Sequence, residues 1–382
     1  MGHRVADQVL IVGGGPAGLA TAIALRLAGV EAQVFDRRQP PIDKACGEGL
    51  MPDGVERLLD LGVQIDPSQS ARFYGIRYRD AEFVAEARFR ENYGLGIRRP
   101  RLHAAMIRRA EELGVTLNWG VQVLGLTATG IETDRGNIEG DWRIGADGLL
   151  SRVRGWAGLE GTPRRRQARA SRLARGRFGV RCHFAVSPWT DCVEVHWAEG
   201  CEAYVTPVGP DEVGVAFLWS EPGVGFEALL ERFPSLGRKL RGAIRTSEVM
   251  GCGPLDQRPK GIQIGKVALV GDAAGYRDAI TGEGLALAFH QAGALAEAIR
   301  RNDLRLYEGA VQRLVRLPFG LIATLLFIEK RPHCRRRLLR ALAQDGKLFV
   351  RLLAIHARQK PLTSLGLGRA VRLAWKVLVS CP

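Results

Sequence analysis

The chain has 382 residues, of which 46% are hydrophobic, and a formal net charge of +15 at pH 7. A chain of this length can bury a large core and is long enough for two lobes and a tail. Its seven cysteines include no C-x-x-C pair and no metal-ligand cluster, which argues against a metal site and favours a reducing compartment. The first predicted strand starts by Val5, so cleavage of a secretory signal would remove the motif that follows, and we expect a cytoplasmic protein.

The first motif is a glycine-rich turn that follows a short apolar strand, Val9 to Val12. In G-x-G-x-x-G spacing the first glycine permits a tight turn, the second lets a pyrophosphate approach the backbone, and the third lets the helix pack closely. A second strand then ends at an acid that is placed to bind a ribose 2′-hydroxyl. The order of these parts predicts a dinucleotide site, shared by FAD and NAD, at Gly13, Gly15, Pro16, Ala17, Gly18, Asp36 and Arg37.

A second motif lies in Val267 to Leu285, which reads VALVGDAAGYRDAITGEGL. The pattern predicts a buried strand, an acidic turn and the glycine-rich start of a helix. Asp272 can accept a hydrogen bond from a ribose hydroxyl, while Gly282 and Gly284 leave backbone N–H groups free at a helix N-terminus. Such a terminus suits a group that becomes anionic when it is reduced, so we interpret this stretch as the second half of a flavin site.

With a third stretch, Ile144 to Arg154 (IGADGLLSRVR), the chain resembles the para-hydroxybenzoate hydroxylase-type FAD-dependent oxidoreductases. Within that superfamily it is most similar to the geranylgeranyl reductase-like and FAD-dependent monooxygenase branch, over residues Val5 to Ile299. The resemblance implies an α/β fold: a Rossmann-like FAD-binding domain with an inserted antiparallel β-sheet substrate domain and a helical C-terminal tail. It also implies further contacts with FAD at Arg99, Asp147, Gly148, Gly271, Asp272, Gly282, Gly284 and Leu285.

The middle of the chain is rich in short β-branched and aromatic runs separated by turn signals, which predicts a separate antiparallel sheet. We therefore expect a discontinuous FAD-binding domain at 1–72, 95–165 and 255–300. The substrate-binding sheet is expected at 73–94 and 166–254, and a basic helical region at 301–382.

Three side chains are candidates for a catalytic role. Cys46 lies in Lys44-Ala45-Cys46-Gly47-Glu48-Gly49, where the resemblance implies a loop that passes over the flavin, and a buried inert thiol is the ordinary alternative. Tyr204 and His183 are candidates for polar contacts with substrate, although such residues on a sheet are more often structural. The chain departs from the family pattern at Asp278-Ala279-Ile280-Thr281, where many relatives have a proline.

Positive charge is concentrated at the C-terminal end. From Arg300 onward there are 18 Lys and Arg residues against 4 Asp and Glu residues, which is a net +14 of the total +15. Runs such as Arg335 to Leu342 alternate basic and apolar residues at helical spacing. This pattern suits an anionic membrane surface, and the alternative is that the apolar faces pack on the FAD domain. The apolar run Leu317 to Ile328 is too short to span a bilayer, and no nucleic-acid motif accompanies the charge.

The sequence thus predicts an FAD-dependent oxidoreductase, and two reactions stay open. The first is NAD(P)H-dependent hydroxylation of an aromatic or polyketide-like lipophilic substrate. The alternative is reduction of carbon–carbon double bonds in a prenyl or other lipid substrate. NAD(P)H is the expected electron donor, although the chain has no second nucleotide fingerprint for it.

Overall fold

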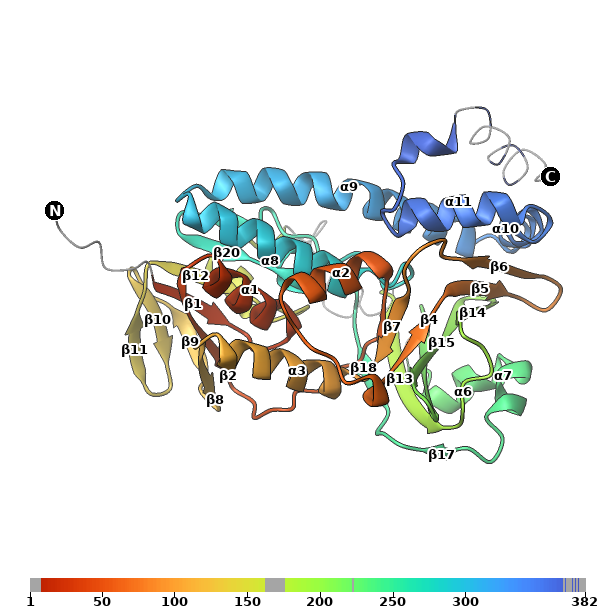
Figure 1. The fold of residues 1–382 in the computed structure, drawn as a ribbon, viewed down its shortest axis with the longest axis horizontal. Coiled ribbons are helices and arrows are strands. Elements are labelled where there is room, and N and C mark those ends of the chain that lie inside the picture. The colour runs from red at the N-terminus through yellow and green to blue at the C-terminus, as the bar shows by residue number, and fades with distance from the viewer. Residues whose placement is uncertain are drawn as a thin grey trace.

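The computed structural model describes residues 8–161, 176–221 and 223–366, together with Gly368, Leu373, Trp375 and Val377. It consists of a Rossmann-like lobe, a second lobe built on a large sheet, and a layer of C-terminal helices that lies across both (Figure 1). The predicted α/β class with an inserted sheet and a helical tail is confirmed.

The Rossmann-like lobe is built on a six-stranded sheet. Its strand order is β19 (Gln263–Ile264), β20 (Val267–Leu269), β12 (Trp142–Gly145), β1 (Gln8–Val12), β2 (Glu31–Asp36) and β8 (Thr116–Trp119). All neighbours are parallel except β19 and β20. Because helices and a second layer cover both faces, β1 carries a continuous apolar run rather than an alternating one.

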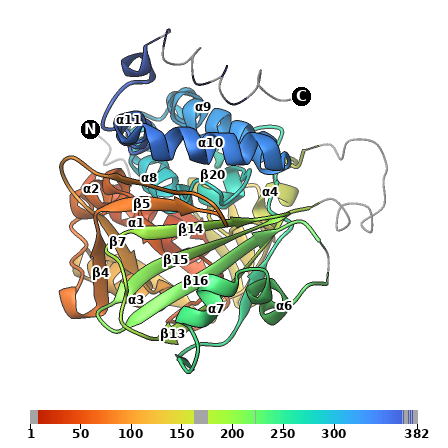
Figure 2. The same cartoon turned by 90° about the vertical axis from the view of Figure 1, so that its right-hand side faces the viewer.

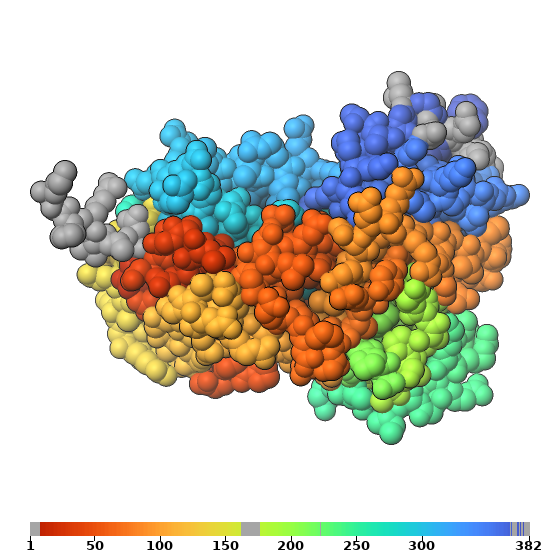
Figure 3. Space-filling model, viewed as in Figure 1, coloured from red at the N-terminus to blue at the C-terminus, as the bar shows by residue number. Residues whose placement is uncertain are grey.

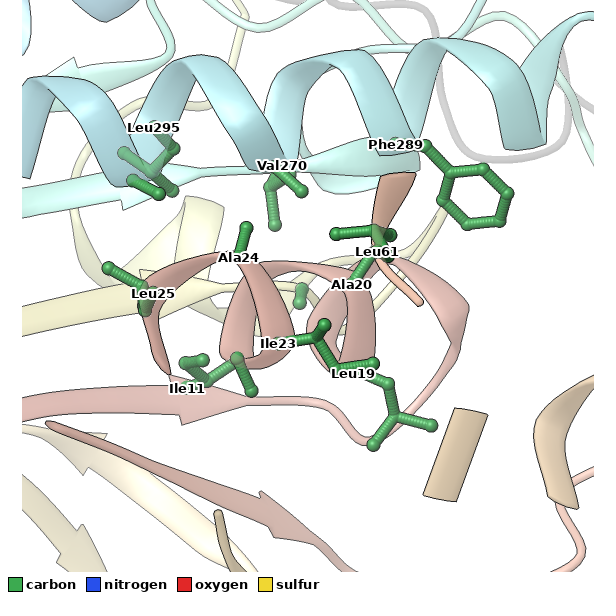
Figure 4. Packing of buried hydrophobic residues seen from close by; sticks show 14 of the residues in the cluster. Ile11, Leu19, Ala20, Ile23, Ala24, Leu25, Leu61, Val270, Phe289 and Leu295 are labelled. Atoms are coloured by element: carbon green, nitrogen blue, oxygen red, sulfur yellow. The ribbon is translucent and has the colours of Figure 1, made fainter. Parts of the chain in front are cut away.

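One face of this sheet is covered by α1 (Pro16–Leu27), α3 (Arg99–Glu112) and α8 (Gly284–Arg300). Ile11 from the sheet, Ile23 from α1 and Phe289 from α8 belong to the resulting core (Figure 4). The opposite face packs against a meander of β9 (Val123–Leu126), β10 (Gly130–Thr133) and β11 (Gly136–Glu139) and the short α4 (Arg152–Trp156). The sheet is therefore held rigidly on both sides, which fixes the loops at its carboxyl edge.

The second lobe contains an eight-stranded sheet that we call the roof sheet. Its order is β17 (Ile244–Arg245), β13 (Phe178–Ala185), β16 (Glu212–Trp219), β15 (Cys201–Gly209), β14 (Val193–Ala198), β5 (Gly75–Arg79) and β6 (Val84–Arg88), and β18 (Met250–Cys252) also pairs with β13. We expected an antiparallel sheet, and one pair differs, because β5 runs parallel to β14. That pair joins a strand from residues 73–94 to the later strands, and such a join needs no hairpin.

The two faces of the roof sheet differ in chemistry because side chains alternate along each strand. The outer face carries apolar residues such as Val180 and Phe217, which α6 (Phe226–Glu231) and α7 (Pro234–Lys239) cover. The inner face carries buried or half-buried polar residues on the two strands that flank β16: Arg181, His183, Glu202, Tyr204 and Thr206.

A small sheet joins the two lobes. It has the order β3 (Gly49–Leu50), β7 (Gly94–Ile97) and β4 (Ser70–Phe73), and α2 (Pro52–Asp60) follows β3. On β7 a Cβ added to Gly96 would lie 1.7 Å from the carbonyl oxygen of Pro207, so only glycine lets the joining sheet approach the roof sheet this closely. Short 3-10 turns, η1 (Pro67–Gln69), η2 (Gly271–Ala274) and η3 (Leu362–Leu365), complete the connections.

The C-terminal helices lie on one side of the molecule (Figures 1 and 2). α9 (Leu304–Glu329) packs along α8, while α10 (Pro332–Gln344) and α11 (Gly346–His356) pack on β6. Figure 3 shows these helices in blue above orange residues, the colour of the segment that includes β6. Their apolar faces thus cover the roof sheet rather than only the FAD domain, and Arg335 is 7% exposed and donates to the carbonyl oxygen of Ala198 at 2.7 Å.

We predicted that the apolar segment of the tail is too short to span a bilayer, and this prediction was wrong. The run Leu317 to Ile328 lies inside α9, a single helix of 26 residues that continues through Pro318. Among the described residues α9 alone passes the length and composition test for a membrane span, with a mean hydropathy of 1.6 and 22% of that window buried. Charged residues at the N-terminal end of α9 hid its length, because we counted only the uncharged run.

Candidate functional site

The glycine turn after β1 has the geometry that its spacing predicts. Gly13 has φ of +111°, and a Cβ there would lie 2.4 Å from the carbonyl oxygen of Ala146. A Cβ on Gly18 would lie 1.9 Å from the carbonyl oxygen of Gly13, so α1 packs directly on the turn. The backbone N–H of Gly14 donates to Asp36 at 2.8 Å, which ties the acid at the end of β2 to the turn.

Gly15 differs from its neighbours because its missing side chain faces open space. A Cβ built there would meet no described atom within 4 Å, and its φ of −71° suits any residue. Pro16 and Ala17 follow at the first positions of α1, whose N-terminal N–H groups therefore point toward this space. Arg37, after Asp36, is exposed, and its role as a cofactor ligand stays a prediction.

His103 holds the glycine turn by a hydrogen bond to its backbone, and the sequence reasoning did not identify this residue. The N–H of Ile42 donates to Nδ1 of His103 at 3.1 Å, so Nε2 carries the ring proton and donates to the carbonyl oxygen of Gly14 at 2.7 Å. Burial lowers the pKa of this imidazole and the charge of Arg99 lowers it further, which keeps the ring neutral.

Arg99, the first residue of α3, has buried polar atoms without a partner. Its Nε and Nη1 atoms find no hydrogen-bond acceptor among the described residues, although its backbone N–H donates to Glu48 at 2.8 Å. A buried guanidinium left unpaired is costly, so its surroundings suit an anionic ligand. This placement fits the FAD phosphate contact that the family resemblance implies for Arg99.

The middle motif has a structural role that we did not predict. The carboxylate of Asp147 accepts hydrogen bonds from the Ser151 hydroxyl at 2.5 Å and from the N–H of Arg152 at 2.6 Å, so it caps α4. Gly148 has φ of +84°, and its missing Cβ would lie 3.3 Å from Nζ of Lys44. Lys44 in turn forms an ion pair with Asp272 at 3.0 Å. The stretches Ile144–Arg154 and Val267–Leu285 therefore meet through Lys44, which the sequence reasoning did not select.

The stretch Val267–Leu285 supplies the start of α8. Gly271 has φ of +63°, and a Cβ there would lie 2.7 Å from Ala17 of α1, so the turn packs against the glycine-turn helix. Its N–H donates to the side chain of Gln291 at 2.7 Å. Gly282 has φ of +69° with no described atom within 4 Å of a Cβ, and α8 begins with Gly284 and Leu285. Through Gly271, the turn that precedes α8 therefore lies beside the first turn of α1.

The loop that carries Cys46 is held by the inner face of the roof sheet. Arg181 donates to Asp43 at 2.5 Å, and the Thr206 hydroxyl donates to the carbonyl oxygen of Gly47 at 2.9 Å. His183 pairs with Glu48 through Nε2 and lies 2.7 Å from the hydroxyl of Ser247 through Nδ1. Both ring nitrogens of His183 are thus engaged inside the protein, and its predicted contact with substrate is untested; the geometry gives it the role of positioning Glu48.

Cys46 itself is partly exposed, and its sulfur accepts from the N–H of Glu48 at 3.4 Å. Glu48 has φ of +57°, which a residue other than glycine rarely adopts, and its carboxylate bonds with His183 and Arg99 offset that strain. The conformation turns the loop sharply beside Cys46. A catalytic role for Cys46 stays a prediction.

Tyr204 contacts the loop that precedes α8. Its hydroxyl donates to the carbonyl oxygen of Ile280 at 3.0 Å, and burial raises its pKa well above the ordinary tyrosine value. Ile280 belongs to an apolar cluster with Leu149, Leu218, Leu255 and Ile322, against which Phe319 of α9 and Tyr276 also pack. This cluster forms an apolar wall between the roof sheet, the loop before α8, and α9.

Comparison with known proteins supports an FAD-binding domain. The family described as FAD binding domain matches residues 6–181, slightly less than half of the chain, which include the glycine turn, Arg99 and Asp147. Together with the relatives below, this match indicates an FAD-dependent oxidoreductase. The open space at Gly15 and the unpaired atoms of Arg99 are what an FAD pyrophosphate would fill, so the residues present fit the cofactor.

Proteins with several different activities are similar to this chain in sequence. It is 29% identical over 315 residues to a putative 2-heptyl-3-hydroxy-4(1H)-quinolone synthase of Rhodococcus erythropolis, covering 78% of this chain and 81% of that protein. It is 28% identical to digeranylgeranylglycerophospholipid reductase 1 of Methanothermobacter thermautotrophicus, covering 73% of each chain. A dialkyldecalin synthase of Streptomyces rugosporus is 32% identical, but that match spans only 41% of this chain and 35% of that protein.

The fold is also found in solved structures. A flavoprotein/dehydrogenase from Cytophaga hutchinsonii superposes with a TM-score of 0.78 at 16% identity, covering 92% of each chain. At this identity the likeness shows the fold alone. The two lobes and their order along the chain are therefore shared with other flavoproteins.

Substitution of Gly15 by alanine tests the FAD fit. Because a Cβ at Gly15 meets no described atom, the stability of the apoprotein should stay within about 0.5 kcal/mol of the parent. The methyl group would nevertheless occupy the pyrophosphate space, so we expect the FAD dissociation constant to rise about tenfold or more, a loss of about 1.4 kcal/mol.

Thermal unfolding of the apoprotein and titration of FAD by flavin fluorescence measure the two quantities. Gly225→Ala is the matched control, since Gly225 also has open space and a negative φ but lies at the start of α6 in the other lobe. Unchanged FAD affinity in Gly15→Ala would refute the assignment of this space to the pyrophosphate.

Proposed function

We propose that the protein is an NAD(P)H-dependent FAD monooxygenase that hydroxylates an aromatic or polyketide-like lipophilic substrate. The observation that carries the proposal is the apolar wall around Ile280, which the roof sheet and α9 close over the loop preceding α8. Such an environment excludes water and favours a substrate that buries apolar surface. Support from relatives comes from the quinolone synthase of Rhodococcus erythropolis, which matches most of its own length.

The residues of the site would divide the work between binding and shielding. The glycine turn, Asp36 and Arg99 would hold the ADP half of FAD, and Asp272 with the start of α8 would hold the flavin half. When bound, FAD would supply two-electron chemistry, accepting a hydride from NAD(P)H and enabling transfer of one oxygen atom from O₂ to the substrate. The N-terminus of α8 would stabilise negative charge beside it.

The tyrosines of the wall would act as neutral hydrogen-bonding groups. Burial raises the pKa of both Tyr204 and Tyr276 well above 10, so each keeps its phenolic proton at physiological pH. Tyr204 uses that proton to hold the carbonyl oxygen of Ile280. Tyr276 lies beside the cleft among Asp272, Cys252 and Cys46, where its hydroxyl could orient a polar group of the substrate.

Reduction of a carbon–carbon double bond is the second candidate reaction. The observation in its favour is Cys46 beside the positive-φ turn at Glu48, a placement in which a thiol could give a proton to substrate. The match to the digeranylgeranylglycerophospholipid reductase supports it equally. Both reactions would use the same FAD site and the same apolar wall.

Product masses separate the two reactions. FAD-loaded protein supplied with NADPH and phenolic or lipid-extract candidates should give a product that has gained one oxygen atom, and only in air. A product that gains two hydrogens without air would contradict the monooxygenase proposal and support the reductase. The Gly15→Ala variant, loaded poorly with FAD, is the control for chemistry that does not depend on the site.

The tail is proposed to dock the enzyme on an anionic membrane from the cytoplasmic side. α9 is largely apolar yet 22% buried over its most apolar window, and Leu306 and Phe327 are each 44% exposed on it. Exposed arginines accompany them, including Arg313 and Arg316, which suits anionic headgroups. A lipophilic substrate could then pass from the membrane along α9 to the apolar wall, because Phe319 and Ile322 of α9 form part of that wall.

Flotation with vesicles tests the docking. We expect the protein to float with anionic vesicles and not with zwitterionic ones, and the double change Leu306→Ser with Phe327→Ser to reduce flotation several-fold because it removes apolar anchoring. Ile244→Ser is the control, since Ile244 is 74% exposed on the roof sheet, away from the tail. Equal flotation of the double variant and the parent would overturn the proposal.

A further inference from the structure

Four charged side chains lie together in the interior, where one guanidinium faces three carboxyl groups. Arg177 contacts Glu202 at 2.5 Å through Nη2, Asp278 at 2.9 Å through Nε, and Glu329 at 3.7 Å through Nη1. None of the four side chains is more than 8% exposed. We call these residues the buried acid cluster.

The buried acid cluster joins parts of the chain that are far apart in sequence. Arg177 immediately precedes β13, and Glu202 is the second residue of β15, so two members belong to the roof sheet. Asp278 lies in the loop before α8, and Glu329 is the last residue of α9. The guanidinium of Arg177 thus connects the roof sheet with the loop before α8 and with the end of α9.

The charge of the cluster does not balance if every group is ionised. Three carboxylates and one guanidinium would leave a net charge of −2 in the interior, which is strongly unfavourable in a region of low dielectric. The pKa of Glu202 is raised to about 7: burial is the largest cause of the rise, Arg177 opposes it, and Glu329 contributes to it. Burial also raises the pKa of Asp278, so the cluster retains a proton near neutral pH.

Within the part of the chain that the structure describes, no second cation is found among the main groups that act on Glu202. The groups that act on its pKa are Arg177, Glu329 and Asp278, and the nearby Cys201, Tyr78 and Tyr204 are all held neutral by burial. Arg177 stays charged, because the neighbouring carboxylates outweigh its own desolvation and raise its pKa. A change in pH near neutrality therefore changes the charge of the carboxyl groups.

Direct hydrogen bonds connect the buried acid cluster to the rest of the loop before α8. While one oxygen of Asp278 meets Arg177, the other accepts from the N–H of Ile280 at 3.0 Å. The carbonyl oxygen of Ile280 accepts from Tyr204 at 3.0 Å, and Gly282 follows two residues later at the entrance to α8. Asp278 also lines a cavity of about 20 Å³ with Asp272 and Thr281, which has room for about one water molecule.

We propose that the buried acid cluster is a proton-holding unit that positions the loop 278–282 for FAD binding. With its proton in place, Arg177 holds Glu202 and Asp278 together and the loop keeps its contact with Tyr204. Loss of the proton sets like charges against each other and loosens the loop. The inference depends on where FAD lies and not on which reaction the protein performs.

Glu202→Gln tests the unit, because the amide copies the size of a carboxyl group that cannot ionise. For the parent we expect the FAD dissociation constant to rise about fivefold or more between pH 6 and 8.5, a typical size for coupled sites. In Glu202→Gln the dissociation constant should be nearly independent of pH over that range. Glu231→Gln on α6, an exposed carboxylate of the same lobe, should behave as the parent does.

Thermal unfolding of the apoprotein gives a second readout that does not involve FAD. Because the folded-state pKa of Glu202 is raised from 4.5 to about 7, its contribution to stability is present below pH 4.5 and is lost as pH rises toward 7. The melting temperature of Glu202→Gln minus that of the parent should therefore increase by a few degrees from pH 5 to pH 8. For Glu231→Gln that difference should stay constant.

Two results would overturn the inference. One is an FAD affinity of the parent that does not change between pH 6 and 8.5, and the other is a Glu202→Gln variant that keeps the parent's pH dependence. If Glu202→Gln does not fold, Glu329→Gln removes one charge from the same cluster and is judged by the same criteria. Failure of the monooxygenase proposal would leave both readouts intact, since neither measures product.

Discussion

The contacts between the inner face of the roof sheet and two loops of the Rossmann-like lobe determine the shape of the site. Arg181 and Thr206 hold the loop that carries Cys46, and Tyr204 holds the loop that leads into α8. These loops belong to the segments that we expect to surround the flavin half of FAD. Without these contacts, the glycine turn could still bind the ADP half, but the loops around the flavin would lack a fixed position.

Polar groups on the inner face have a cost, because desolvated charges and hydroxyls destabilise a fold unless each finds a partner. The structure meets part of this cost by using the partners as positioning contacts: Asp43 for Arg181, Glu48 for His183, and the carbonyl oxygens of Gly47 and Ile280 for the two hydroxyls, while Nε and Nη1 of Arg181 find no partner among the described residues. The apolar outer face, by contrast, only has to pack against α6 and α7. The alternation of side chains along the strands thus separates a face that stabilises the lobe from a face that organises the site.

Much of the Rossmann-like lobe could be predicted from the sequence because its signals are local. The glycine spacing fixes a turn that shows the expected positive φ at Gly13 and the expected close approach at Gly18, and apolar runs fix the parallel strands. Contacts between distant segments left no local signal. Lys44 meets Asp272 across 228 positions and His183 meets Glu48 across 135, so neither pair could be read from spacing.

The tail shows a second limit of sequence reasoning. Alternation of basic and apolar residues predicted helices there, but it did not indicate which face would be buried, and Arg335 turned inward to the roof sheet. Glu329 likewise looks like an ordinary charge at a helix end, yet it faces Arg177 in the interior. A charge that is buried can be recognised only when all the elements around it are in place.

The most direct test of whether the inner face of the roof sheet positions the Cys46 loop is amide hydrogen exchange of Thr206→Val. This substitution keeps the shape of the side chain and removes its hydrogen bond to Gly47. Removal of one such bond is worth about 1 kcal/mol, or roughly fivefold in an opening equilibrium. The account predicts faster exchange confined to residues 43–50, together with weaker FAD binding and unchanged exchange in the glycine turn. Unchanged exchange in residues 43–50, or acceleration spread over the whole roof sheet, would contradict the claim that this face positions the loop.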